Sequence, residues 1–382
     1  MKFAHLGDCH LGGWSQQELR DLNFKAFQYA INLCIKKKVE FVLISGDLFD
    51  SAYPPIETLK EAFYEFKRLK EAGISVFLIA GSHDYSASGK TFLDVLESAG
   101  LCKNVSLFEE HNGKIMLYPT QYKNVAIYGY PGRKSGLEVD DVNRVKIQDS
   151  PGLFKILMLH TVIKDAIGNL PIPSVDEKNL PEVDYVALSH LHINYKRENR
   201  VYSGPIFPNN LLELEELKEG SFYFYEYGKV IREPVKLKEV LAVTLEITNA
   251  LNATEQIIKY IETQSIKDKI LILKLEGIIG NGKISDIDFK KIEQIVREKG
   301  AFSFLKSITK LHHAGLHINV ESADSVDLEP VIVDKFINSN PNKYSSLINP
   351  LIRSLQASRM EEEKLSVFED RLLAEIKKII PL

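Results

Sequence analysis

The sequence predicts an α/β layer fold built on buried strands, and two observations support this. Short runs such as FVLIS at 41–45 and VAIYGY at 125–130 are almost wholly apolar, as strands covered on both faces are. In the first half of the chain these runs alternate with segments whose apolar residues recur at helical spacing. That order is typical of a sheet whose strands are joined by helices.

The first 100 residues predict a regular alternation of strands and helices. Proline favours the first turn of a helix and glycine the position after its last turn, which sets the limits of the second helix. In chain order we expect a strand at 3–6, a helix at 20–38, a strand at 41–45, a helix from Pro54 to Gly73, a strand at 76–80 and a short helix at 90–99.

The next stretch is richer in strands. We expect three of them, at 125–130, 155–160 and 185–190. Residues 221–235 alternate apolar and polar side chains around Gly228, which predicts a hairpin that closes the first domain. The rest of 101–152 carries no motif.

A second alternation begins near Val240 and indicates a small α+β domain. Its expected elements are strands at 241–247, 269–277, 302–310 and 316–322, and helices at 254–263 and 285–299. A polar, turn-rich linker follows at 338–343, and the apolar residues between 347 and 379 have the spacing of amphipathic helices. We therefore divide the chain into three parts, 1–236, 237–337 and 338–382.

Composition excludes several classes of protein. The 382 residues carry a net charge of −4, so the chain is not a free-standing basic nucleic-acid binder. Its three cysteines form no CxxC pair, which excludes a cysteine-rich zinc module and suits a reducing cytoplasm. No apolar run reaches the roughly 20 residues of a membrane helix, and the N-terminus does not resemble a secretory signal. We expect a cytoplasmic protein that does not bind membranes.

Polar side chains follow the predicted strands at the point where each strand ends. The sequences are DCH at 8–10, GDLFD at 46–50, GSHD at 81–84, a histidine at 160 and HLH at 190–192. Of the ten histidines in the chain, five lie at these strand ends. In open α/β sheets, ligands bind beyond the carboxyl ends of the strands, so we expect these side chains to form one site.

The residue types indicate a metal site. In an extended chain residues i and i+2 point the same way, so Asp8 with His10, and His190 with His192, are expected to converge. Imidazole with carboxylate suits manganese, iron or zinc. Five histidines with two or three carboxylates suit two ions, which together form a clamp for displacement at phosphorus. A single histidine at a strand end would be interpreted as a cap of the backbone or as polar surface. Five such motifs in this order, each after an apolar run, favour a metal site.

This set of motifs resembles the calcineurin-like metallophosphoesterases, whose signature is DxH, GDxxD, GNHD or GNHE, H and GHxH. The strings HLGDCHLGG and SGDLFDSAYPP are most similar to the SbcD-type nucleases of DNA double-strand-break repair. The resemblance implies a four-layer αββα sandwich at 1–236, a small α+β capping domain at 237–337, and C-terminal helices at 338–382 that dock on an SbcC-type coiled-coil ATPase.

The resemblance also implies a role for each motif residue. His83 would face the phosphate, stabilise the transition state and protonate the leaving oxygen, oriented by Asp50. The metal ligands would be Asp8, His10 and His192 for the first ion, Ser82, His160 and His190 for the second, and Asp47 bridging both.

Ser82 departs from the family pattern, which has asparagine at this position. The serine side chain is one bond shorter, so its oxygen falls short by about 1 Å, whereas metal–ligand distances tolerate only about 0.2 Å. We expect Ser82 to bind through a water molecule, or the second ion to bind more weakly. Ser189 in place of the glycine before HxH, and Pro205 where related nucleases often have serine, are two further departures.

The resemblance implies a manganese-dependent 3′→5′ exonuclease and endonuclease that processes double-stranded DNA ends, as a homodimer with the ATPase. Two Mn²⁺ ions are expected, with Mg²⁺, Fe²⁺ or Zn²⁺ as alternatives. Two other functions remain open: a small-molecule phosphodiesterase or phosphatase of the same fold, and a DNA-end-binding scaffold with an impaired second metal site. Trp14 is expected either to anchor its loop or to line the substrate groove.

Overall fold

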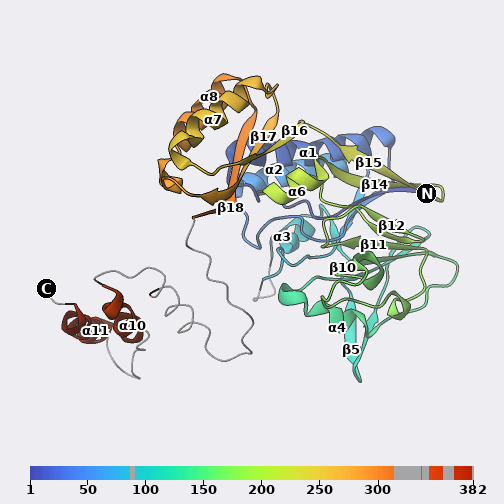
Figure 1. Cartoon of the computed structure of the whole chain (residues 1–382). Coiled ribbons are helices and arrows are strands. Elements are labelled where there is room, and N and C mark those ends of the chain that lie inside the picture. Colours follow the sequence, from blue (N-terminus) through green and yellow to red (C-terminus); the bar gives the residue numbers. More distant parts are fainter. Residues whose placement is uncertain (87–90, 314–336, 338–343, 356–364, 381–382) are drawn as a thin grey trace. The chain divides into compact units, whose positions relative to one another are not determined.

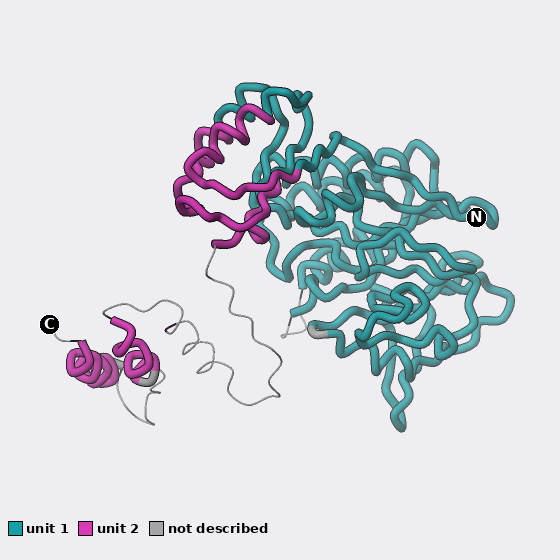
Figure 2. Tube along the Cα trace, in the orientation of Figure 1, with its two compact units in different colours: residues 1–243, 261–273, 293–306 teal, residues 244–260, 274–292, 307–382 magenta. Residues whose placement is uncertain are grey.

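The structure is a computed structural model that describes residues 1–86, 91–313, 337, 344–355 and 365–380. The chain divides into two compact units (Figure 2). Unit 1 comprises 1–243, 261–273 and 293–306, and unit 2 comprises 244–260, 274–292 and 307–382.

Unit 1 contains two six-stranded sheets. The order of the first sheet is β15-β14-β1-β2-β3-β4, in which β1 to β4 run parallel. Strand β14 is antiparallel to β1 and forms a hairpin with β15 at the sheet edge (Figure 1). Its strands are β1 (Lys2–Leu6), β2 (Phe41–Ile44), β3 (Ser75–Leu78), β4 (Lys103–Asn104), β14 (Gly220–Glu226) and β15 (Lys229–Val235).

The order of the second sheet is β12-β13-β11-β10-β8-β7. Strands β8, β10, β11 and β13 run parallel, and antiparallel strands β7 and β12 form its two edges. Its strands are β7 (Thr120–Tyr122), β8 (Val125–Tyr130), β10 (Phe154–His160), β11 (Tyr185–Ser189), β12 (Tyr195–Arg197) and β13 (Arg200–Tyr202).

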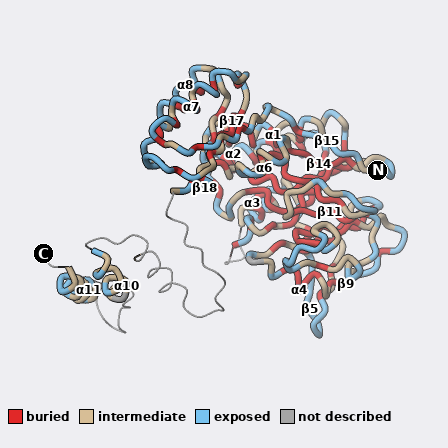
Figure 3. The backbone as a smooth tube through the Cα atoms, in the orientation of Figure 1, coloured by how far each residue is buried: buried red, intermediate tan, exposed pale blue. Residues whose placement is uncertain are grey.

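The two sheets pack face to face through a core of aromatic and aliphatic residues. Phe3, Phe41 and Phe77 of the first sheet share a buried cluster with Ile127 and Met158 of the second. Alternate residues such as Ala4 and Val42 point to the opposite face of the first sheet. Buried residues accordingly run along both sheets, which explains why the strands are apolar throughout (Figure 3).

Helices α1 (Gln17–Lys37) and α2 (Ile56–Glu71) cover the outer face of the first sheet. The outer face of the second sheet packs against α4 (Glu138–Val142) and a small sheet of β5 (Phe108–His111), β6 (Lys114–Leu117) and β9 (Val145–Ile147). The expected sandwich is therefore confirmed. Its fourth layer consists of a short helix and a small sheet, which together cover the outer face of the second sheet.

Local signals placed most elements correctly. Helix α2 begins directly after Pro55, and the chain leaves it through Gly73, whose φ of +72° is easily adopted only by glycine. The hairpin turns at Tyr227 and Gly228, with φ of +48° and +90°. Two successive positive φ values are typical of the type I′ turn, which matches the twist of the flanking strands.

The segment 101–152 contains more structure than its sequence predicts. Strands β4 to β7 and β9 have two to four residues each, too few to show a period of two. The strand expected at 316–322 and the linker at 338–343 lie outside the described residues. The remaining short elements are α3 (Phe92–Ser98), η1 (Lys134–Gly136), α5 (Lys164–Ile167), η2 (Glu177–Asn179) and α6 (Leu211–Leu217).

A three-stranded sheet, in the order β16-β17-β18, follows the sandwich in the sequence. Its strands are β16 (Val240–Glu246), β17 (Ile270–Ile279) and β18 (Ser303–His313), connected by α7 (Ala250–Thr263), η3 (Ile284–Asp286) and α8 (Phe289–Glu298). Two further helices, α10 (Ser345–Leu355) and α11 (Leu365–Ile379), contact each other in unit 2. Within the described residues, no helix has the length and apolarity needed to cross a bilayer.

Phe3→Ala is expected to lower the free energy of unfolding by about 3–5 kcal/mol, as measured by urea denaturation. The side chain of Phe3 is fully buried and stacks on Phe41 at 4.9 Å and on Tyr225 at 4.8 Å between ring centroids. Tyr227→Ala is the control, because that ring is 81% exposed, and a change of at most about 0.5 kcal/mol is expected. Equal losses in the two variants would contradict this account of the core.

Candidate metal centre

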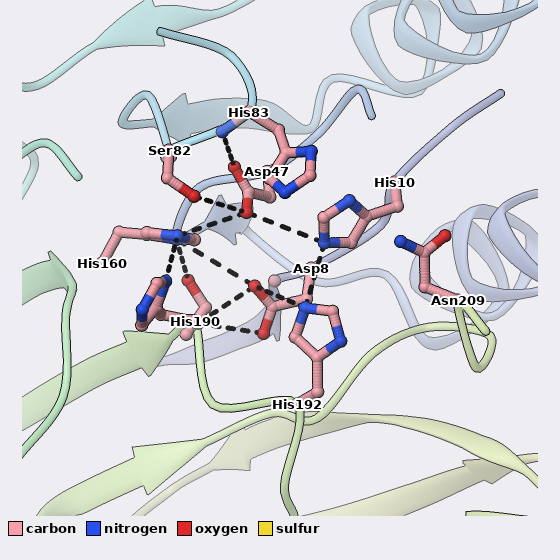
Figure 4. Close-up of polar contacts among 12 residues, drawn as sticks. Asp8, His10, Asp47, Ser82, His83, His160, His190, His192 and Asn209 are labelled. Carbon is pink, nitrogen blue, oxygen red and sulfur yellow. Dashed lines mark hydrogen bonds and ion pairs between the residues drawn. The ribbon is translucent and has the colours of Figure 1, made fainter. Parts of the chain in front are cut away.

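The motif side chains converge beyond the carboxyl ends of both sheets (Figure 4). Strands β1, β2 and β3 of the first sheet end at Leu6, Ile44 and Leu78, just before three of the motifs. Strands β10 and β11 of the second sheet end at His160 and Ser189. Because the strands are parallel within each sheet, the motifs share one edge of the sandwich.

A first cluster consists of Asp8, His10 and His192, whose potential ligand atoms all lie within 4.8 Å of one another. The Nε2 atoms of the two histidines are 3.0 Å apart, and Nε2 of His192 is 3.8 Å from Oδ1 of Asp8. Asp8 and His10 are buried. Carboxylate and imidazole groups that face one another at this range fit a divalent cation.

A second cluster consists of Asp8, Asp47 and His160. Nε2 of His160 lies 3.2 Å from Oδ2 of Asp47, and the same carboxylate oxygen is 3.6 Å from Nε2 of His10. His190 adds a ring nitrogen, since its Nδ1 is 3.1 Å from Nε2 of His160. Asp8 thus belongs to both clusters, and Asp47 of the second cluster also faces His10 of the first.

The paired motifs converge for a different reason than the sequence suggested. They were expected to be extended, but they lie beyond the strand ends in left-handed backbone, where residues other than glycine are rare. Positive φ values occur at Asp8 (48°), His10 (42°), Asp47 (50°), His190 (102°) and His192 (46°). Backbone strain of this kind is typical of functional sites, where the surrounding structure holds it in place.

Two glycines allow these strand ends to approach closely. A Cβ atom on Gly81 would lie 2.2 Å from Oδ1 of Asp47, and one on Gly46 would lie 2.4 Å from Nδ1 of His160. Gly46 also has a φ of +110°. The GD and GSHD motifs therefore require glycine so that Asp47 and His160 can pack against the backbone.

Ser82 points toward the second cluster but makes a weak contact there. Its Oγ lies 3.5 Å from Oδ2 of Asp47, at the limit of a hydrogen bond. The Ser82 side chain thus places a neutral oxygen near the Asp47 carboxylate.

His83 lies at the open side of the clusters, with 47% of its side chain exposed. Its backbone N–H donates to Oδ1 of Asp47 at 2.8 Å. Its ring Nδ1 lies 2.8 Å from the backbone carbonyl oxygen of Asp50 but 3.7 Å from the Asp50 carboxylate. A carbonyl only accepts, so Nδ1 carries the proton in this contact and Nε2 takes no part in it.

The Asp50 carboxylate is occupied by other partners. Its Oδ1 lies 3.0 Å from Nδ1 of His10 and accepts a hydrogen bond from Nδ2 of Asn209 at 3.2 Å. Burial alone would raise the pKa of Asp50, but the hydrogen bond and charge of His10, together with Asn209 and His83, outweigh it and the pKa is lowered. Asp50 thus holds His10 through its side chain and His83 mainly through its backbone.

Glu213 and Asn209 support the clusters, and neither was identified from the sequence. Oε1 of Glu213 lies 3.0 Å from Nδ1 of His192, and its Oε2 accepts the N–H of Asn209 at 2.8 Å. The pattern from Asn210 to Glu213 signals the start of helix α6, where the Asn210 side chain caps the backbone. That local signal carries no information about contact with a histidine 21 residues earlier.

Asp84 has a structural role that the motif did not reveal. Its carboxylate is buried and accepts the N–H groups of Leu48, Phe49 and Gly81 at 3.0–3.1 Å. It therefore joins the loops that follow β2 and β3. Burial and the nearby charge of Asp47 raise the pKa of Asp84 to about 6.

The charges of the clusters compensate one another. Burial opposes the positive charge of His160, but Asp47 and Asp8 outweigh it and raise its pKa to about 9. The pKa of His190 moves the other way: burial and the charge of His160 lower it to about 4. Burial would raise the pKa of Asp47, but His160 and His10 hold it well below its usual range. The Asp47 carboxylate is therefore ionised, as a metal ligand must be.

Trp14 anchors its loop. Its indole Nε1–H donates to the carbonyl oxygen of Pro208 at 2.9 Å, and only 6% of the residue is exposed. The first of the two expected roles is thus confirmed.

The stability of the metal-free protein is expected to fall as the pH rises from 6.5 to 9. Burial lowers the pKa of His192, but Asp8 and Glu213 outweigh it and raise the pKa from 6.5 to about 9. Between these values the folded chain keeps a proton that the unfolded chain has released, so raising the pH favours unfolding, by on the order of 2 kcal/mol for this group. Urea denaturation in the presence of a chelator measures this change.

His160 shifts the stability in the same direction, so a variant is needed to isolate His192. Glu213→Gln removes the charge beside His192 and is expected to make the fall with pH less steep. An equally steep fall in Glu213→Gln would contradict the assignment.

Comparison with known proteins agrees with this geometry. Residues 1–194 match the calcineurin-like phosphoesterase family. The chain is 26% identical over 398 residues to the DNA double-strand break repair protein Mre11 of Methanosarcina mazei, covering 99% of this chain and 61% of that protein. It is 27% identical over 379 residues to the Mre11 of Methanocaldococcus jannaschii, covering 95% and 96%.

Other relatives are more distant or less informative. The metallophosphoesterase YhaO of Bacillus subtilis is 26% identical over 276 residues, covering 66% of this chain and 65% of that protein. Among solved structures, a dimetal phosphatase from Danio rerio aligns at 12% identity with a TM-score of 0.37, covering 63% of this chain and 97% of that one, a score too low to support a conclusion. On the match that spans its first half, the chain belongs to the calcineurin-like phosphoesterase family.

Proposed function

We propose that the protein is a two-metal phosphodiesterase that cleaves DNA ends as a 3′→5′ exonuclease and endonuclease. The observation that carries the proposal is the pair of adjoining clusters that share Asp8 and are linked by the contact of Asp47 with His10, with the exposed His83 beside them. The proposed ligands are those expected from the motifs: Asp8, His10 and His192 for one ion, His160, His190 and, weakly, Ser82 for the other, and Asp47 for both.

Two divalent cations, when bound, would supply a water-derived nucleophile at neutral pH and offset the charge on the phosphoryl oxygens. The chain positions the other groups. Asp47 accepts the backbone N–H of His83, and the carbonyl of Asp50 accepts from its ring Nδ1, which leaves Nε2 available to the substrate. When protonated, Nε2 would donate its proton to the leaving 3′ oxygen, as a general acid does.

DNA is the proposed substrate because the relatives aligned over nearly the whole chain are named as DNA double-strand break repair proteins. The net charge of −4 gives the chain little attraction for DNA on its own. Bound cations and a partner would supply this attraction. Manganese is proposed as the ion because a mixed set of imidazole and carboxylate donors suits it.

The three proposed parts are the nuclease domain at 1–236, the capping domain at 237–337 and the docking helices at 338–382. In the last part, α10 and α11 contact each other and still expose apolar side chains, including Leu355 and Leu373 at 61% and 52%. Exposed apolar stripes on paired helices fit a helical partner. We propose that this partner is an SbcC-type coiled-coil ATPase, and that both proteins work in the cytoplasm, where the three unpaired cysteines stay reduced.

A homodimer is proposed through the outer surface of α1 and α2. A groove of about 440 Å³ there is lined by Phe24, Phe63, Tyr64 and Leu101, with Lys60, Lys67 and Glu61 among them. Tyr64 is 62% exposed. An apolar groove with charges of both signs is self-complementary, which suits a two-fold interface between two copies.

In a cleavage assay, the full chain is expected to shorten end-labelled linear duplex DNA from its 3′ ends with Mn²⁺ and not with chelator. His83→Ala is expected to reduce the rate at least 100-fold, because general acid catalysis contributes about 10²–10⁴-fold. His111→Ala is the matched control, since His111 is exposed on β5, outside the two clusters, and it is expected to cleave at the normal rate.

Other outcomes would favour the alternatives. Hydrolysis of bis(p-nitrophenyl) phosphate without DNA cleavage, also after addition of the ATPase, would support a small-molecule phosphodiesterase. Tight binding of DNA ends without hydrolysis of either substrate would support a scaffold with an impaired second metal site.

Light scattering coupled to gel filtration is expected to give twice the chain mass of 43.3 kDa for the wild-type protein. Tyr64→Glu places a charge in the apolar groove and is expected to give monomers. Tyr227→Glu, at an exposed ring on the β14–β15 turn, is the control and is expected to remain dimeric. A monomeric wild type, or a dimeric Tyr64→Glu, would contradict this interface.

A further inference from the structure

The hydroxyl of Ser189 lies in a buried contact between the two sheets. Ser189 ends β11 in the second sheet and is fully buried. Its Oγ donates to the carbonyl oxygen of Ser45, the residue that follows β2 in the first sheet. The same Oγ lies 2.9 Å from Nδ1 of His160.

The direction of these hydrogen bonds follows from the chemistry of each group. A carbonyl oxygen only accepts, so the single hydroxyl proton of Ser189 is directed to Ser45. A lone pair of Oγ then accepts a hydrogen bond from the N–H at Nδ1 of His160. This arrangement leaves Nε2 of His160 as the nitrogen that faces Asp47, 3.2 Å away.

No other contact replaces Ser189 fully. If Ser189 lost its hydroxyl, Nδ1 of His160 would keep one hydrogen-bond partner among the described residues. This partner is the Ser45 carbonyl oxygen, at the longer distance of 3.3 Å. The ring would then be held less firmly and its tautomer would be less strictly determined. Second-sphere partners of this kind orient a ligating histidine and raise its basicity.

The environment of Ser189 is tightly packed. A Cβ atom placed on Gly7 would lie 2.6 Å from Cβ of Ser189 and 2.7 Å from Oγ of Ser45. A third buried serine, Ser203, belongs to the same group, but its hydroxyl donates to the carbonyl of Gly204 and, among the described residues, forms no hydrogen bond with a histidine. Ser203 can therefore serve as a matched control for Ser189, since both serines are buried in the same group.

We propose that Ser189 is a positioning residue that holds His160 for the second ion and thereby offsets the weak donor at Ser82. This inference rests on the proposed metal site. The Ser82 side chain is one bond shorter than the asparagine of the family pattern, so we expect the second ion to have one weaker donor than the first. Its affinity then depends more on how well His160 is held.

Calorimetric titration of the full, metal-free chain with Mn²⁺ tests this inference. The wild-type protein is expected to bind two ions in two steps of different affinity. Ser189→Ala is expected to weaken the weaker step about 10–100-fold and to leave the tighter step unchanged. Ser203→Ala is expected to change neither step. Adding Ser82→Asn to Ser189→Ala is expected to restore much of the lost affinity.

A spectroscopic measurement separates positioning from a general loss of structure. In the zinc-loaded wild-type protein, the proton on the His160 ring is expected on Nδ1, with slow exchange with solvent in histidine-selective NMR spectra. In Ser189→Ala this proton is expected to exchange faster. The wild-type spectrum requires no variant, so it remains decisive if Ser189→Ala fails to fold.

Three results would be decisive against the inference. Unchanged affinity in a folded Ser189→Ala, or a ring proton on Nε2 in the loaded wild type, would overturn the role of Ser189 while the metal site stands. No Mn²⁺ binding by the wild-type chain would overturn the proposed metal site itself, and the role of Ser189 with it.

Discussion

The hydrogen bonds from the backbone N–H of His190 to the Asp8 carboxylate, at 3.0 and 3.1 Å, join the two sheets at the point where the site is built. Asp8 follows the first strand of one sheet, and His190 follows β11 of the other. The Ser189 contact with the Ser45 carbonyl joins the sheets beside them. If these strand ends were not held together, the two halves of the donor set would belong to separate surfaces.

The same contacts explain why strained backbone persists around the site. Five donors have positive φ values, and each such residue costs of order 1–3 kcal/mol. The buried carboxylate of Asp84 accepts three backbone N–H groups from the loops after β2 and β3 and so fixes the approach of Asp47. Burial makes each of these hydrogen bonds expensive to lose, which stabilises this arrangement of the loops.

Much of the fold was predictable because its signals are local. The helices from Gln17 and Ile56 follow from apolar periodicity and proline, and the strands of the sandwich follow from runs of apolar residues. The short strands between 103 and 147 were not predictable, because a strand of two to four residues has no period and forms only when a neighbouring strand supplies its hydrogen bonds.

The sequence by itself determined which residues could form a metal site, because DxH, GDxxD, HD and HxH carry their chemistry in the residue types. Tertiary structure decided how they meet, in left-handed backbone beyond the strand ends. It also decided that the Asp50 carboxylate bonds to His10 while the Asp50 backbone carbonyl bonds to His83. It also added Glu213, Asn209 and Ser189, which contact their partners across 21 to 159 residues of chain. Such contacts leave no local pattern, because only the tertiary packing of the sheets, helix α6 and their loops brings these residues together.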